Sequence, residues 1–185
     1  MDDEYIDVIT EQGKVTGEKA LKSEIHSKGY YHNTAHVWLY TANGEILLAQ
    51  RAATKVICPS LWDVSVAGHV DAGEFIIHAA IREVKEEIGL ELHPNDLQKI
   101  GVFKCFQSYN NNSIKDNEFH HTYIVELKVP LHELTLQINE VDNVKLVTFD
   151  AFNTILNNIG KDNHFVPSNK AYYRIVLERI KDKFN

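Results

Sequence analysis

Three glutamates stand within about one helical turn of each other near the middle of the chain, at positions 83, 86 and 87. A helix through residues 74–88 places these three carboxylates on one side. The opposite side then carries an apolar stripe formed by Ile77, Ile81, Val84 and Ile88. Because like charges on one patch repel one another, the pattern predicts that hard divalent cations neutralise them. A purely solvated acidic face is the alternative interpretation.

Magnesium is the divalent cation that best suits such a patch. Held by carboxylates and phosphate oxygens together, it can neutralise a diphosphate, polarise its phosphorus and lower the pKa of a coordinated water. Manganese is an alternative to magnesium in sites of this kind. We therefore expect Mg²⁺ or Mn²⁺ as the cofactor.

The spacing around these glutamates matches a known family motif. Every fixed position of the Nudix box is filled in the run GHVDAGEFIIHAAIREVKEEIGL, by Gly68, Glu74, Arg82, Glu83, Val84, Glu86, Glu87, Gly89 and Leu90. The chain therefore resembles the Nudix family, whose members cleave compounds in which a nucleoside diphosphate, or a similar diphosphate, is linked to another group. The resemblance implies an α/β fold, the Nudix α/β/α sandwich with a mixed β-sheet.

The same resemblance implies a role for each polar residue of the motif. Glu83, Glu86 and Glu87 supply metal ligands, one glutamate acts as the base on water, and the backbone of Gly68 joins the metal shell. Arg82 orients a glutamate. Glu74 supports the site from the start of the helix, near its positive end. For Arg82 and Glu74, a salt bridge that only fastens the loop to the helix is an equally good interpretation.

Outside the motif, the chain is similar to one branch of the family, the isopentenyl diphosphate isomerases and the hydrolases that resemble them. The similarity covers about 7–126, through YHNTAHVWLYTANGEILLAQRAATK, CPSLWDVSVAGHVDAGE and DNEFHHTYIVEL. Five positions fall on metal ligands of the isomerases, namely His26, His32, His69, Asp116 and Glu118. Lys22, Arg51 and Lys55 fall on the cations that hold the substrate diphosphate. Glu118 is in addition a candidate base, while a surface or core position remains the alternative for each histidine.

One departure from the isomerases separates the possible reactions. These isomerases carry a cysteine immediately before the Gly-His pair, where this chain has Ala67. A methyl group cannot transfer a proton, and the Nudix box, usually degenerate in the isomerases, is complete here. We therefore predict a metal-dependent hydrolase in which water attacks phosphorus. An isomerase and a non-catalytic nucleotide-sensing module are the two alternatives.

The composition is that of a single globular domain, which we expect to cover residues 1–185. Of its side chains, 44% are hydrophobic and 24% charged, and its net charge of −7 disfavours nucleic acid or an anionic membrane as a partner. Cys58 and Cys105 show no CxxC spacing, which suits a reducing compartment. Without a signal peptide or a long apolar run, a cytoplasmic location is the expectation. A homodimer is left open.

The elements that must position these residues follow from local patterns. We expect strands at 5–10, 35–41, 45–51, 63–67, 99–107, 121–129 and 144–149, with a hairpin turn at Asn43-Gly44. Residues 19–26 indicate a weak helix or loop, and two helices are expected at 150–158, capped by Asp150, and from Pro167 to 183. The loops 106–118 and 160–169 are candidates for substrate contacts, with Phe106, Tyr109 and Phe165 available to stack on a base.

The alanine at position 67 leads to a direct prediction. We expect the protein not to interconvert isopentenyl and dimethylallyl diphosphate at a physiological rate, because no thiol is present to move the allylic proton. The measurement is deuterium incorporation into isopentenyl diphosphate from heavy water, followed by mass spectrometry. Efficient incorporation would show that another acid replaces the cysteine.

Overall fold

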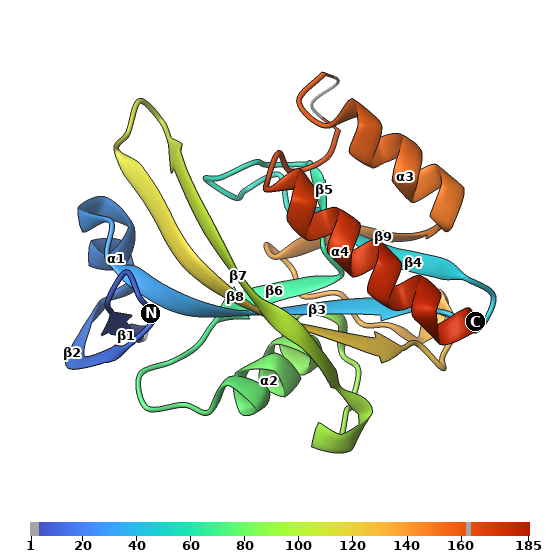
Figure 1. Ribbon diagram of the computed structural model, residues 1–185, viewed down its shortest axis with the longest axis horizontal. Coiled ribbons are helices and arrows are strands. Elements are labelled where there is room, and N and C mark those ends of the chain that lie inside the picture. The colour runs from blue at the N-terminus through green and yellow to red at the C-terminus, as the bar shows by residue number, and fades with distance from the viewer. Residues whose placement is uncertain (1–3, 162–163) are drawn as a thin grey trace.

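A mixed β-sheet lies between helices on both of its sides in the computed structural model, which describes residues 4–161 and 164–185. Helix α2 (Ile76–Ile88) covers one side, and α3 (Phe149–Asn158) and α4 (Lys170–Lys181) cover the other (Figure 1). The short helix α1 (Lys22–Lys28) lies beside the N-terminal strands. The predicted α/β/α sandwich is confirmed. None of the helices in these two ranges is long and apolar enough to cross a membrane.

Strand β3 organises the sheet. The described residues form nine strands: β1 (Tyr5–Ile9), β2 (Val15–Leu21), β3 (Tyr31–Tyr40), β4 (Glu45–Arg51), β5 (Trp62–Asp63), β6 (Val66–His69), β7 (Gln98–Tyr109), β8 (Ile114–Glu126) and β9 (Val141–Thr148). Strand β3 pairs antiparallel with β1, β4 and β6 and parallel with β8. Strands β2 and β7 extend the sheet beyond β1 and β8, while β5 and β9 flank β4. One strand therefore touches most of the elements that carry candidate site residues.

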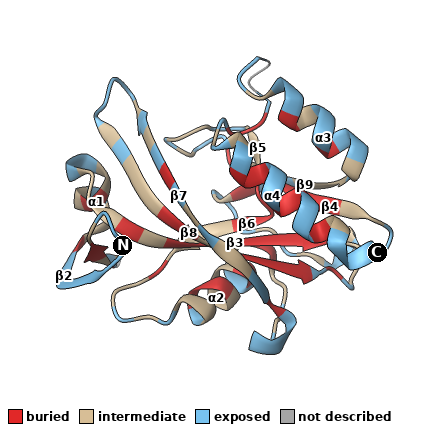
Figure 2. Ribbon diagram, in the orientation of Figure 1, coloured by how far each residue is buried: buried red, intermediate tan, exposed pale blue. Residues whose placement is uncertain are grey.

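The alternation of side chains along β3 divides the core into two layers. Ala35, Val37 and Leu39 belong to a buried cluster with the apolar residues of α2. Trp38 and Tyr40 belong to a second cluster, which includes the apolar residues of α3 and α4. Figure 2 shows β3 and β4 as buried strands between these helices. The position of each polar residue along β3 therefore also determines which face of the sheet its side chain lies on.

Strands β3 and β4 are joined at one end through a buried serine. They pair at Tyr40 and Ile46, beside the predicted hairpin turn. The hydroxyl of Ser65 accepts a hydrogen bond from the Leu39 N–H at 2.8 Å and donates one to the Leu47 carbonyl at 2.6 Å. Ser65 is fully buried, so these bonds satisfy backbone groups that would otherwise lack partners.

Several boundaries differ from the sequence prediction. Strand β8 begins at Ile114, seven residues before the predicted start, because it pairs with both β3 and β7 over its polar first half. The predicted helix or loop at 19–26 is divided between β2 and α1. The cap of α3 is Thr148, whose hydroxyl accepts a hydrogen bond from the Ala151 N–H, so the prediction of Asp150 as the cap was wrong.

Candidate active site

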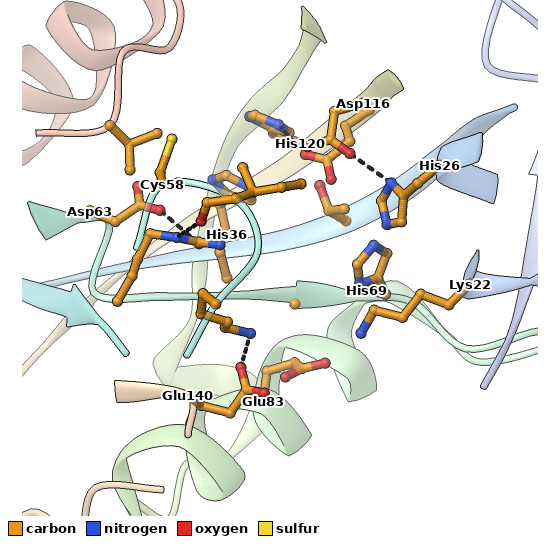
Figure 3. A pocket seen from close by; sticks show the side chains of 18 of the residues that line it. Lys22, His26, His36, Cys58, Asp63, His69, Glu83, Asp116, His120 and Glu140 are labelled. Carbon is orange, nitrogen blue, oxygen red and sulfur yellow. Dashed lines mark hydrogen bonds and ion pairs between the residues drawn. The ribbon is translucent and has the colours of Figure 1, made fainter. Parts of the chain in front are cut away.

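A cavity of about 790 Å³ collects side chains from α1, β3, β4, β6, α2 and β8. Figure 3 shows Glu83 on one side of it, Lys22 and His69 near the centre, and His26 and Asp116 on the other. The predicted site residues that line it are Lys22, His26, Arg51, Lys55, Gly68, His69, Arg82, Glu83, Glu86, Glu87, Asp116 and Glu118. His32 contacts this set through its neighbours, and Glu74 through Arg82. The structure thus brings together residues that are up to 96 positions apart, from Lys22 to Glu118.

The lining of the cavity is strongly acidic. Its carboxylates are Glu4, Asp63, Asp71, Glu83, Glu86, Glu87, Asp116, Glu118 and Glu140. Its lysine and arginine side chains are Lys22, Arg51, Lys55 and Arg82. Among the described residues, nine carboxylates therefore face four obligate cations, an excess of five acidic groups. Such a lining favours the binding of additional positive charge.

Arg82 holds the acidic side of α2 together. Its Nε and Nη2 donate to the two oxygens of Glu74 at 3.0 and 2.9 Å. Its Nη1 donates to Glu83 at 2.8 Å and to Glu86 at 3.2 Å, while Nη2 also reaches the carbonyl of His69 at 3.0 Å. Glu74 in turn accepts a hydrogen bond from the Asp71 N–H at 3.1 Å. Arg82 therefore fastens the loop to the helix and orients two glutamates at once.

Gly68 lies directly against the carboxylate of Glu83. A Cβ atom added at position 68 would stand 1.9 Å from the Glu83 Cδ and 2.1 and 2.3 Å from its two oxygens. These separations are far shorter than any real contact, so only glycine allows the backbone of β6 and this carboxylate to approach so closely. The close approach explains in steric terms why the motif needs a glycine here.

Two of the three glutamates of α2 resist ionisation. Burial raises the pKa of Glu83 to about 7, against the lowering effect of Arg82. Burial, followed by the charges of Glu83 and Glu140, raises the pKa of Glu87 well above its usual range. Both effects come from holding negative charge away from water and close to other carboxylates. A bound cation would reverse them, because it stabilises the ionised form.

Each predicted substrate-binding cation already has a carboxylate partner. Arg51 Nη1 lies 3.3 Å from Asp63 Oδ2, and its Nε donates to the Ile57 carbonyl at 3.0 Å. Lys55 forms an ion pair with Glu140. Lys22 Nζ lies 2.8 Å from Glu4 Oε2. Sequence reasoning missed these partners, although the proximity of Asp63 to Arg51 follows from the pairing of β4 with β5.

Three histidines converge on one side of the cavity. The ligand atoms of His26, His32 and His69 lie within 4.8 Å of one another. The His26 ring stands at 86° to that of His32 and at 73° to that of His69, with centroids 5.4 and 5.2 Å apart. His26 Nδ1 is 2.7 Å from Asp116 Oδ1, and His32 Nε2 is 3.5 Å from Glu118 Oε1. The predicted cluster is therefore assembled in space.

Several buried polar atoms of this cluster lack a hydrogen bond of satisfactory geometry, although His26 Nδ1 and Asp116 Oδ1 stand close enough to form an ion pair. Among the described residues, the atoms concerned are His26 Nδ1, His32 Nε2, His69 Nε2 and Asp116 Oδ1. The other ring nitrogen of His32 donates to the Tyr30 carbonyl at 3.0 Å, which leaves Nε2 free to face the cluster. Buried polar groups are normally paired, so four atoms in this state at one place fit a metal ion.

Two further histidines, which sequence reasoning missed, lie beside Glu118. His120 Nε2 is 2.7 Å from Glu118 Oε2, and the His120 ring stacks on His36 with centroids 3.8 Å apart. Burial alone would raise the pKa of Glu118, but the hydrogen bond with His120 and the neighbouring His32 ring hold it well below its usual range. The sequence contains a signal for His120, because residues 116, 118 and 120 are two positions apart and so lie on the same face of a strand.

Of the three aromatic residues considered available to stack on a substrate base, two do not line the cavity. Phe106 stands outside the cavity and packs edge-on to Tyr31 with centroids 5.3 Å apart. Phe165 is buried in the core against Phe152 and Tyr173. Tyr109 does line the cavity. Residues 162–163 of the predicted loop 160–169 lie outside the described residues.

Comparison with known protein families identifies the family to which the chain belongs. The NUDIX domain model matches residues 30–168, which is most of the chain. The chain belongs to the Nudix family. This membership confirms the resemblance that the motif between Gly68 and Leu90 indicated, and it agrees with the α/β/α layers.

Two relatives and one solved structure illustrate the membership. The chain is 36% identical over 140 residues to an uncharacterised Nudix hydrolase of Clostridium acetobutylicum, covering 74% of this chain and 66% of that protein. It is 28% identical over 132 residues to an isopentenyl-diphosphate Delta-isomerase of Cutibacterium acnes, covering 69% and 64%. The chain thus spans slightly less than two thirds of either relative. A crystal structure of a Deinococcus radiodurans protein shares the fold, with a TM-score of 0.66, 18% identity and coverage of 98% and 100%.

The buried Glu83 predicts how stability depends on pH in the metal-free Nudix protein. Its pKa rises from 4.5 to about 7 on folding, so the folded state binds this proton more tightly than the unfolded chain does. The resulting stabilisation is complete below pH 4.5 and is lost as the pH rises through 7. At about 1.4 kcal/mol per pH unit, the loss is on the order of 3 kcal/mol.

Denaturant unfolding in the presence of a chelator measures this effect. Between pH 4.5 and 7.5, we expect the wild type to lose about 3 kcal/mol more of its free energy of unfolding than Glu83→Gln does. Parallel pH profiles for the two proteins would contradict the assignment.

Proposed function

We propose that this Nudix protein hydrolyses a diphosphate linkage in a small molecule, by attack of water on phosphorus, with Mg²⁺ or Mn²⁺ as the cofactor. The main support for the proposal is the lining of the cavity, to which the described residues contribute nine carboxylates but four lysine and arginine side chains. Cations bound to these carboxylates attract a diphosphate that the acidic lining alone would repel. A nucleoside diphosphate derivative and other small diphosphate compounds both fit this chemistry.

The metal ligands are assigned to the two opposite sides of the cavity. Glu83, Glu86 and Glu87, with the carbonyl of Gly68, would hold ions on the α2 side. His26, His32, His69 and Asp116, with Glu118, would hold another on the β3 and β8 side. When bound, such ions polarise a phosphoryl oxygen and lower the pKa of a water. Imidazole and carboxylate ligands together suit manganese, zinc or magnesium.

The protein's own side chains bind the substrate and take up the proton. Arg51, Lys55 and Lys22 would exchange part of their contact with Asp63, Glu140 and Glu4 for oxygens of the diphosphate. Arg82 keeps Glu83 and Glu86 in place. Glu83, Glu86 or Glu118 would accept the proton of the attacking water at a carboxylate oxygen.

The two alternative functions are disfavoured by specific residues. Ala67 stands opposite His36 on the neighbouring strand and offers no proton for an allylic shift, despite the similarity to an isomerase. A module that only senses nucleotides does not need the complete set of motif carboxylates. The intact motif and the acidic cavity therefore favour hydrolysis.

Incubation with a panel of diphosphate compounds tests the proposed function. We expect products of hydrolysis, identified by mass, that require Mg²⁺ or Mn²⁺ and disappear in excess chelator. Glu86→Gln and Glu87→Gln each remove a ligand charge at constant volume, so turnover should fall by about two orders of magnitude or more. Glu91→Gln, on an exposed residue that pairs with Lys85, is the matched control and should turn over normally. Hydrolysis that persists in excess chelator would contradict the proposal.

A carboxylate outside the motif provides an independent prediction. Glu118→Gln removes a candidate metal ligand and base without removing packing volume, so we expect turnover to fall at least about tenfold with little change in thermal stability. Steady-state kinetics and a thermal unfolding curve provide the two measurements. Normal turnover in this variant would show that Glu118 is only a structural partner of His120.

A further inference from the structure

The carboxylate of Glu118 lies between two histidines, and each histidine is close to a different oxygen of the carboxylate. Oε1 faces His32 Nε2 at 3.5 Å, on the side of the three-histidine cluster. Oε2 is 2.7 Å from His120 Nε2, a direct hydrogen bond. Because a carboxylate can rotate about its terminal bond, one locked oxygen fixes the direction of the other. His120 thus determines where the free oxygen of Glu118 points.

The ring of His120 is itself rigidly held. It is 4% exposed and stacks on His36 at an interplanar angle of 17°, with centroids 3.8 Å apart. Tyr172, from α4, stands against both rings, with centroids 5.5 Å from His120 and 5.9 Å from His36. Contacts from β3 and α4 therefore leave His120 little freedom to turn.

A chain of hydrogen bonds fixes the orientation of the His36 ring behind this stack. Trp38 Nε1 donates to the Tyr172 hydroxyl oxygen at 2.8 Å, and an indole nitrogen can only donate. The hydroxyl hydrogen of Tyr172 is then available to His36 Nδ1, which lies 3.1 Å away. The contact between His36 Nδ1 and the Tyr172 hydroxyl holds the His36 ring whichever of the two groups donates. The wall that supports His120 is therefore a ring in a defined orientation.

The stacked histidines do not resemble a second metal centre. The ligand atoms of His36, Glu118 and His120 lie within 4.8 Å of one another, as in the three-histidine cluster. The rings of His36 and His120 are in face contact, however, with centroids 3.8 Å apart, whereas the parallel rings of His32 and His69 are 5.3 Å apart and His26 stands edge-on to both of them. The Nε2 of His120 is also already bonded to Glu118.

We propose that His120 is a positioning residue for Glu118, supported by the stacked ring of His36 and by Tyr172. It holds Oε2 so that Oε1 faces the ligand atoms of His26, His32 and His69. The catalytic consequence rests on the hydrolysis proposed above, but the effect on metal binding does not. Such support of a metal ligand commonly changes metal affinity or activity by about 10- to 100-fold.

Matched substitutions at position 120 separate this role from simple packing. His120→Phe keeps a flat ring that can stack on His36 but removes the N–H group. His120→Gln replaces the ring but carries an amide nitrogen at about the place of Nε2. His121→Phe is the control, because His121 bonds Asn33 and lines no part of the cavity. If His120→Phe does not fold, His120→Asn serves instead, because its shorter amide matches Nδ1 and does not reach Glu118.

Manganese titration followed by electron paramagnetic resonance is the primary measurement, and it needs no substrate. We expect His120→Phe to weaken Mn²⁺ binding at the three-histidine cluster about 10- to 100-fold without changing the number of ions bound per chain. His120→Gln should recover most of the affinity, and His121→Phe should match the wild type. In hydrolysis, His120→Phe should lower kcat by a similar factor and leave KM nearly unchanged.

Each contrary result has a distinct meaning. Wild-type Mn²⁺ affinity in His120→Phe, or equal losses in His120→Phe and His120→Gln, would overturn the positioning role. The loss of one bound ion per chain in His120→Phe would show that His120 is a metal ligand, which also overturns it. If Mn²⁺ binding changes as expected but no diphosphate is hydrolysed by the wild type, the positioning role stands and the proposed function fails.

Discussion

Carboxylates held away from water and close to one another set the constraint on which the rest of this cavity depends. Glu83 and Glu87 resist ionisation because they are buried on α2 beside other acids. Arg82 relieves part of the repulsion, but its donors are spread over Glu74, Glu83 and Glu86 and the carbonyl of His69. Leaving a buried carboxylate charged and unpaired is costly, so the arrangement is stable only if protons or cations are taken up.

The sheet makes this crowding possible by bringing separate segments to one place. The parallel pairing of β3 with β8 sets His32 opposite Glu118, and the antiparallel pairing of β3 with β6 sets Thr34 opposite His69. The apolar residues of the same strands pack against helices on both sides, so the polar positions are carried by a rigid core. Gly68 then allows the backbone of β6 to lie against Glu83, which a side chain at this position would prevent.

The sequence was informative wherever a local pattern decided the outcome. The order of elements predicted a mixed sheet between helices, and the Nudix resemblance implied the α/β/α sandwich and the carboxylates that would gather. The segment before residue 121 was misjudged as a loop because its polar residues hide a strand whose alternate side chains face the cavity. The partners Asp63 and Glu140 of the cations, and the His36–His120 stack, arise from tertiary contacts that no local pattern contains.

The central claim is that His26, His32 and His69 are metal ligands, and anomalous diffraction tests it most directly. Crystals grown with Mn²⁺ would be measured on both sides of the manganese absorption edge. The account predicts an anomalous peak within coordination distance of a ring nitrogen of each of the three histidines. A well-ordered cluster without such a peak, while manganese occupies only the glutamates of α2, would contradict it.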